Sequence, residues 1–185
     1  MNYIAFSAVL VGLAAVGDGG QIRAILLAAT YGRPVLVTSG ILLSVIISSL
    51  IAAALGAWMR QMLEPTVRVW LLAAVFLFLA VWSLTRVRVR RTFTLPNGCN
   101  AFSATLASLI PEQFGDKAQI AILALAATYG HADSIFAGAT LGQALVIIPV
   151  TLIGTRAMLG VSLQAVRRIK AAAFAMLTIL ALLHL

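Results

Sequence analysis

Two aspartates stand inside long apolar stretches of the sequence, and a glycine precedes each of them: Gly17-Asp18 and Gly115-Asp116. A charged side chain is costly to bury in a membrane, so ionisable residues in such segments usually mark a pathway for ions or protons. Carboxylate oxygens suit hard divalent cations, and a carboxylate can also take up a proton. The two aspartates therefore predict a site that binds a cation and exchanges it for protons.

The two motifs belong to a repeat with an offset of 98 positions. Residues 17–32 and 115–130 are identical at ten of sixteen positions, and both end in Ala-Ala-Thr-Tyr-Gly. Such self-similarity at a fixed offset indicates a duplicated unit. A glutamine follows each aspartate by three residues, Gln21 in the first copy and Gln119 in the second. We expect both glutamines to assist the aspartates in binding.

The composition is that of a membrane protein. Of 185 residues, 62% are hydrophobic and 10% are charged, and the mean hydropathy is +1.07; soluble domains are nearer 45 to 50% apolar. A membrane-spanning helix needs about 20 mainly apolar residues. Six segments satisfy this: 3–31, 35–57, 67–85, 99–130, 134–155 and 164–184. The predicted class is an all-α polytopic membrane protein with six transmembrane helices and short connections.

The segments 3–31 and 99–130 are too long for straight membrane helices. At 1.5 Å per residue the first would extend about 43 Å, against a hydrocarbon core of about 30 Å. It must tilt strongly or break. In the second segment Pro111 predicts a kink or interruption. A half-helix that begins at Pro111 would place Glu112, Asp116 and Gln119 on one polar face. Gln113 and Glu112 are therefore further candidates to assist the aspartates in binding.

The duplication divides the chain into two three-helix repeats, 1–85 and 99–185, joined by a basic linker at 86–98. Because each repeat holds three helices, the second enters the membrane from the opposite face, which predicts an inverted 3+3 repeat. In transporters of this architecture the substrate site lies at the repeat interface near the midplane. The symmetry thus brings Asp18 and Asp116 toward one central place.

The net charge of +8 predicts orientation in the membrane rather than nucleic-acid binding. Nine basic residues lie in or beside connections 1-2, 3-4 and 5-6, against Arg60 and Arg68 around connection 2-3. By the positive-inside rule those three connections are cytoplasmic and both termini lie on the other side. The nine residues are Arg33, Arg86, Arg88, Arg90, Arg91, Arg156, Arg167, Arg168 and Lys170.

The central part of segment 134–155 also carries polar side chains. Thr140 and Gln143 stand one turn apart, and either face the site or form structural hydrogen bonds. Gly138 and Gly142, four residues apart, predict a helix-packing face.

The sequence has no nucleophile and base pair and no cofactor motif. With the single cysteine Cys99 and two distant histidines, it also has no Cys/His metal framework. We therefore predict neither enzymatic activity nor a cofactor. The predicted partners are the lipid bilayer, a metal ion as transported substrate, and protons, without nucleic acid; whether the chain forms a homo-oligomer stays open.

The two motifs and their surroundings resemble the transmembrane protein 165 family of calcium/manganese-proton antiporters. That family carries Glu-x-Gly-Asp-(Lys/Arg)-(Ser/Thr) twice, in helices one and four. The Gln-Ile after each motif, the Ala-Ala-Thr-Tyr-Gly-Arg-Pro ending and the six-helix plan are also similar, and the resemblance covers the whole chain. It implies a bacterial inner-membrane or Golgi-type protein that exports divalent metal from the cytoplasm in exchange for protons.

The chain departs from the family motif at several positions. Ala15 and Gln113 stand where the motif has glutamate, and the basic position is Gly19 in the first copy but Lys117 in the second. The hydroxyl position holds Gly20 and Ala118. The pairs Gly17-Asp18 and Gly115-Asp116 carry over as motif glycines and metal ligands.

Because half of the expected carboxylates are absent, two other functions stay open. The chain could export a monovalent cation or a small organic solute, or it could be a non-transporting membrane scaffold. A separation of more than about 10 Å between Asp18 and Asp116, with apolar side chains between them, would favour the scaffold, since ion–ligand distances are about 2.0–2.6 Å.

Overall fold

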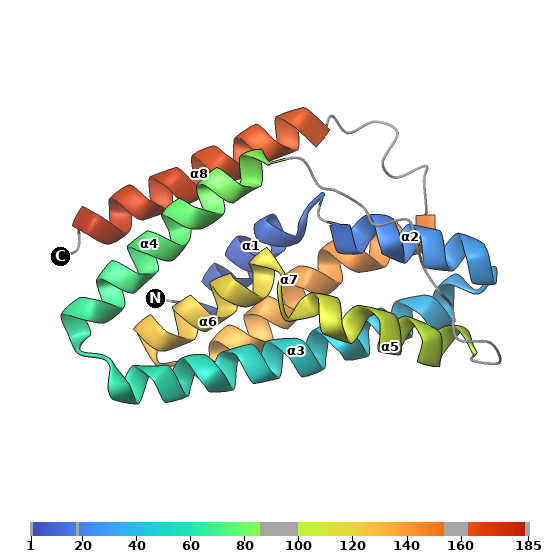
Figure 1. The fold of residues 1–185 in the computed structure, drawn as a ribbon, viewed down its shortest axis with the longest axis horizontal. Coiled ribbons are helices and arrows are strands. Elements are labelled where there is room, and N and C mark those ends of the chain that lie inside the picture. The colour runs from blue at the N-terminus through green and yellow to red at the C-terminus, as the bar shows by residue number, and fades with distance from the viewer. Residues whose placement is uncertain (1, 18, 86–99, 154–162, 184–185) are drawn as a thin grey trace.

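The computed structural model describes residues 2–17, 19–85, 100–153 and 163–183, and this part of the chain is all-α. Its first and last described residues lie toward the same end of the molecule (Figure 1). The predicted linker, residues 86–98, and Asp18 lie outside the described residues. The helices are α1 (Tyr3–Ala15), α2 (Gly19–Tyr31), α3 (Pro34–Met62), α4 (Pro65–Leu84), α5 (Ala101–Gln113), α6 (Lys117–Tyr129), α7 (Ala132–Ile153) and α8 (Leu163–Leu183).

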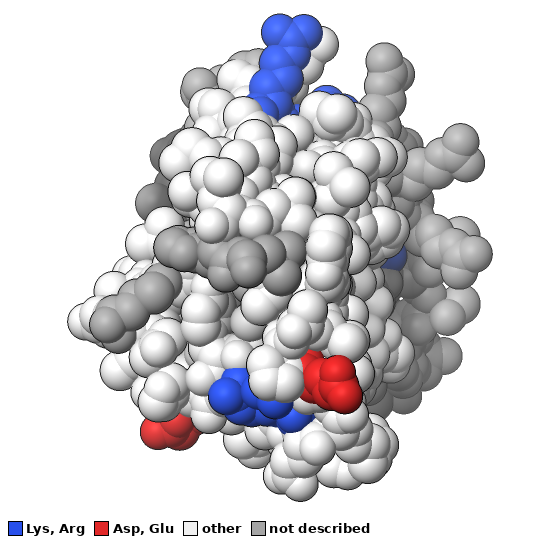
Figure 2. Space-filling model, turned by 90° about the vertical axis from the view of Figure 1, so that its left-hand side faces the viewer, with Lys and Arg blue, Asp and Glu red and all other residues white. Residues whose placement is uncertain are grey.

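Helices α3, α4 and α7 are long and apolar enough to cross a membrane. Large apolar side chains cover much of the outer surface, for example Trp70 and Val81 on α4 and Met176 on α8, which are 57%, 60% and 62% exposed. Figure 2 shows one end of the molecule, where charged side chains are few among uncharged ones. Lipid contact explains such a surface, which in water would be an aggregation hazard. These features agree with the predicted helical membrane protein.

The two overlong segments are each broken into two helices, α1 and α2 in the first copy of the repeat and α5 and α6 in the second. The first break follows Val16, whose backbone is extended, and Gly17 takes a left-handed conformation with φ of 68°. Glycine adopts this conformation without the steric cost of a Cβ atom. The sequence left open whether segment 3–31 tilts or breaks, and the structure shows that it breaks.

The second break differs from the prediction. Pro111 lies inside α5, which continues to Gln113. Asp116 instead stands in extended backbone as the N-cap of α6, and its side chain accepts a hydrogen bond from the Lys117 N–H. An aspartate at this position satisfies the free donors of a helix start, so it fixes where α6 begins. The single polar helical face predicted for Glu112, Asp116 and Gln119 was wrong, because two different helices hold these residues.

The tightest helix contact joins α1 and α7. A Cβ atom on Gly138 would collide with Ile4 and Ser7, and one on Gly142 would collide with the backbone oxygen of Ala8. Both glycines therefore allow the two backbones to touch, which confirms the predicted small-residue packing face.

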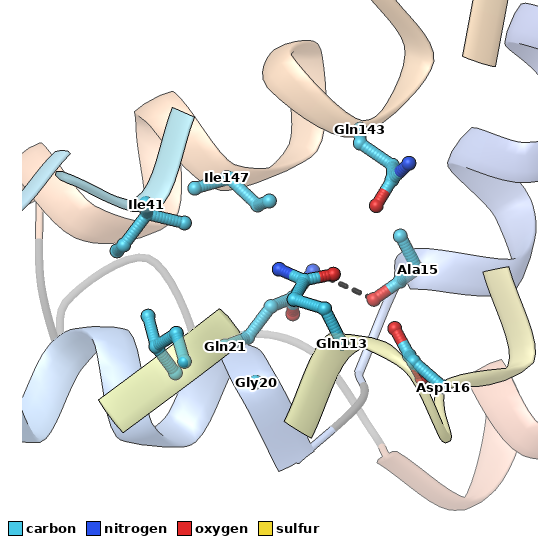
Figure 3. Close-up of a pocket in the computed structure, with 9 residues that line it drawn as sticks. Ala15, Gly20, Gln21, Ile41, Gln113, Asp116, Gln143 and Ile147 are labelled. Carbon is cyan, nitrogen blue, oxygen red and sulfur yellow. Dashed lines mark hydrogen bonds between the residues drawn. The ribbon is translucent and has the colours of Figure 1, made fainter. Parts of the chain in front are cut away.

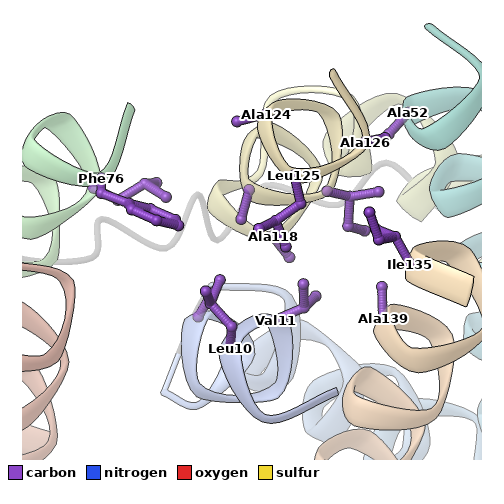
Figure 4. Close-up of a cluster of buried hydrophobic side chains, with 14 of the residues drawn as sticks. Leu10, Val11, Ala52, Phe76, Ala118, Ala124, Leu125, Ala126, Ile135 and Ala139 are labelled. Atoms are coloured by element: carbon purple, nitrogen blue, oxygen red, sulfur yellow. The ribbon is translucent and has the colours of Figure 1, made fainter. Parts of the chain in front are cut away.

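Helix α3 runs the length of the molecule beneath α5, α6 and α7, while α4 and α8 lie side by side (Figure 1). Buried apolar side chains from α1, α3, α4, α6, α7 and α8, among them Leu10, Phe76, Leu125 and Ile135, form the main core (Figure 4). Helix α3 also packs against α2, α5 and α6, which hold the residues on either side of the two breaks.

Candidate functional site

A small cavity lies where the two helix breaks come together, with a volume of about 30 Å³. By volume it has room for about one or two water molecules, or for an ion of similar size. Residues from both copies of the repeat form its wall (Figure 3). They are Ala15, Gly20, Gln21, Ile41, Leu109, Gln113, Asp116, Gln143 and Ile147.

Four polar side chains surround this cavity: Gln21 from α2, Gln113 from α5, Asp116 from the second break and Gln143 from α7. The remaining lining is apolar or glycine. A carboxylate and amide oxygens are suitable ligands for a hard cation. In apolar surroundings their attraction for a cation is stronger than it would be in water.

Asp116 lines the cavity and is also the N-cap residue of α6. Its Oδ1 accepts from the Lys117 backbone N–H at 2.7 Å, so part of the carboxylate serves as a helix cap. The Lys117 side chain is buried, and its ammonium lies 5.3 Å from the centroid of the Trp82 ring. This distance is typical of a cation–π contact, which stabilises a buried positive charge. The second break therefore carries both an acidic and a basic group.

The side chain of Gln21 forms hydrogen bonds with the backbone at the first break. Its Oε1 accepts from the Gly17 N–H at 2.9 Å and its Nε2 donates to the Ala15 carbonyl at 3.0 Å. The side chain is only 4% exposed. Gln21 lines the cavity as predicted, but both ends of its amide already bind the backbone, so it also shapes the break.

Gln119 occupies the equivalent position of the second copy and behaves differently. Its Nε2 donates to Ser48 Oγ at 2.9 Å and to Gln113 Oε1 at 3.4 Å. Its Oε1 is buried without a hydrogen-bond partner among the described residues. Gln119 lines a neighbouring cavity of about 80 Å³ with Ser48 and Phe114, rather than the cavity at the breaks. It is therefore linked to the candidate site through Gln113.

Gln143, whose role the sequence left open, does face the site. It is 1% exposed, lines the cavity, and donates from Nε2 to Ser49 Oγ at 3.1 Å. The signal available in the sequence was a long amide side chain in the middle of an apolar segment. Lys170 was missed altogether: it was counted among the basic residues at a connection, but it lies inside α8 and is 2% exposed.

Some predicted site residues lie outside the described part of the chain. Asp18 is one of them, so its distance to Asp116 stays a prediction, and the side chain of Glu112 is another. Gly17 and Gly115 lie at the two breaks. Among the described residues, no group of three or more His, Cys, Asp and Glu side chains comes together.

Comparison with known proteins identifies the relatives of this chain. The family described as "Divalent cation/proton antiporter GDT1" matches residues 3–90 and 101–185. The chain belongs to this family. A protein of Vibrio cholerae serotype O1, named "Putative manganese exporter", is 31% identical over 180 residues, which cover 97% of this chain and 90% of that protein. No solved structure shows a significant match.

Membership of the GDT1 family confirms the resemblance predicted from the repeated motifs. It also confirms the predicted class of function, since the family consists of divalent cation/proton antiporters. Such proteins are transporters, and their cation is a substrate rather than a resident cofactor. The cavity between the two breaks is accordingly the candidate place for cation binding.

Proposed function

We propose that this member of the GDT1 family exports a divalent cation, manganese or calcium, in exchange for protons, and that the cavity at the two helix breaks is its cation site. One observation carries the proposal: Asp116 and the amides of Gln21, Gln113 and Gln143 surround a space of about 30 Å³. The similarity to a protein named as a manganese exporter supports manganese as the first cargo to test.

The exchange follows from the chemistry of the carboxylates. Asp116, and Asp18 by its equivalent place in the repeat, would bind either a cation or a proton, because a protonated carboxyl no longer attracts a cation. Amide oxygens would complete the coordination without changing the charge. The site then always holds either the metal ion or protons, because leaving it charged and empty in the membrane is costly. This requirement couples metal export to proton entry.

The proposed architecture is an inverted 3+3 repeat of six membrane segments. Its support is that the two copies of the motif both lie at helix breaks, and that the family matches in two stretches, one in each half. The basic connections then face the cytoplasm and the termini face outward. We propose the bacterial inner membrane as the location.

A monovalent cation or small organic solute is the second candidate cargo. Among the described residues that line the cavity, Asp116 contributes the one carboxylate. Affinity for divalent ions depends on the number and charge of the ligands, so a site rich in amides favours ions of lower charge. The non-transporting scaffold is a further outcome of the experiment below.

Transport by purified protein in proteoliposomes tests the proposal. An imposed pH gradient should drive uptake or release of manganese or calcium, and the cation flux should collapse when the gradient is dissipated. Sodium and magnesium are measured in parallel. Flux of sodium alone would favour the second cargo, and absence of flux for all four cations would refute the proposal.

A further inference from the structure

Lys170 is buried in the interior of the molecule, although it belongs to the basic first half of α8. It is 2% exposed, and Phe174 and Thr178, four and eight residues later, are 0% and 8% exposed. Residues at this spacing share one helix face. The buried face of α8 therefore carries Lys170 toward the bundle, whereas Arg168 lies on the exposed side.

The ammonium group of Lys170 binds the end of α1. Its Nζ donates to the carbonyl of Ala14 at 3.2 Å and to that of Val16 at 2.6 Å. The last carbonyls of a helix lack partners within the helix and carry its partial negative charge. With Gln21 Nε2 bound to the intervening Ala15 carbonyl, three successive carbonyls at this break all have donors.

The two copies of the repeat thus each have a buried lysine at the break, but from different places in the chain. In the second copy Lys117 follows Asp116 directly and is 5% exposed. The aligned position of the first copy is Gly19, which has no side chain. Lys170 supplies a positive charge to the first break from α8.

Carbonyl oxygens at the carboxyl end of a broken membrane helix are typical ligands for cations. We propose that the carbonyls of Ala14 and Val16 form a cation site whose resident cation is the Lys170 ammonium. A monovalent metal cation binds there once the ammonium is removed. The tethered charge keeps free cations away from the end of α1. If the proposed function holds, the ammonium keeps the transported cation off these two carbonyls and leaves it to the carboxylates and amides of the cavity.

The competing explanation is that Lys170 only caps α1. Lysine side chains do cap helix ends in this way. A cap and a cation site differ in one measurable respect: loss of a cap lowers stability equally in every salt, whereas an emptied cation site makes stability depend on which cation is present.

The test uses purified full-length protein with Lys170→Gln, which removes the charge and, because its side-chain nitrogen is one bond closer to the backbone, withdraws the donor from the two carbonyls. Arg168→Gln is the matched control, since it removes a positive charge two residues away on the exposed side of α8. The thermal unfolding midpoint is measured in choline, sodium and potassium chloride at equal ionic strength. We expect no cation dependence for the wild type and the control. For Lys170→Gln we expect a saturable rise of about 3 °C or more in sodium or potassium.

An equal loss of stability of Lys170→Gln in all three salts overturns the proposal, and so does a variant that stays unfolded in all three, because the free carbonyls then do not accept a free cation. Folding in sodium or potassium but not in choline supports it. The measurement involves no transport. A wild type that carries no manganese would therefore refute the proposed function and leave this result standing.

Discussion

The replacement of Gln113 by glutamate tests most directly how the cavity binds cations. Gln113 is partly buried, lines the cavity beside Asp116, and its Oε1 accepts from Gln119 Nε2 at 3.4 Å. Glutamate is nearly isosteric and offers the same acceptor, so the variant adds a charge with little change in packing. Ala15 lines the same cavity, so Ala15→Glu would add a second carboxylate from the other copy of the repeat.

The magnitude follows from the size of the site. Taking about 4 Å between the added carboxylate and an ion in the cavity, Coulomb's law with an effective dielectric constant of about 20 gives roughly 4 kcal/mol per unit of ionic charge. Desolvation of the new carboxylate and its repulsion by Asp116 offset most of this attraction. We expect a net gain of at least about 1.4 kcal/mol, which is tenfold tighter manganese or calcium binding.

The assay is titration of manganese and calcium into the purified variant, followed by transport at several pH values. Binding should weaken as the pH falls, because the added carboxylate attracts a cation only when it is deprotonated. Gln61→Glu is the matched control, since Gln61 is exposed near the end of α3 and adds the same charge away from the cavity. A folded Gln113→Glu protein whose affinity matches that of the control would refute the reasoning, because position 113 would then not face the ion.

Three further substitutions test the site and its frame. Asp116→Asn should abolish transport while the protein stays folded, because asparagine also caps helices but has neither the charge nor the proton; full transport activity would contradict the site. Asp18→Asn should have the same effect, measured in the same proteoliposomes. Gly142→Ala should destabilise the protein by about 1–3 kcal/mol, because the added Cβ meets the Ala8 backbone. Gly20→Ala, where the Cβ meets nothing within 4 Å, is its control, and equal unfolding midpoints for the two would disprove the close α1–α7 contact.

The length of the two segments predicted that each must tilt or be interrupted, but it did not place the first break, and the second lies after Gln113 rather than at Pro111. A segment of 29 residues exceeds the thickness of a bilayer, and Gly17 lies where its backbone must turn. In the second copy Pro111 was the stronger local signal, yet α5 accommodates it. The capping preference of Asp116 marked the true boundary, and the expectation of an uninterrupted half-helix from Pro111 hid that signal.

The partners of the polar side chains could not be predicted from the sequence. Gln119 binds Ser48 and Gln143 binds Ser49, adjacent residues of α3 that contact different helices. Such pairs depend on how each helix is rotated about its axis, which packing against its neighbours determines. Lys170 was misread for a related reason: its position near a connection suggested solvent, while the rotation of α8 turns it inward.

The two breaks are alike in sequence but differ in what they leave available to an ion. At the first, the carbonyls of Ala14, Ala15 and Val16 already have the donors of Lys170 and Gln21. At the second, Gln119 Oε1 is buried without a partner among the described residues, and Asp116 borders the cavity. A buried acceptor without a donor is costly, and a cation or a protonated group nearby would remove that cost. The described backbone acceptors of the first break are therefore occupied, and a transported ion must find its ligands among the carboxylates and amides instead.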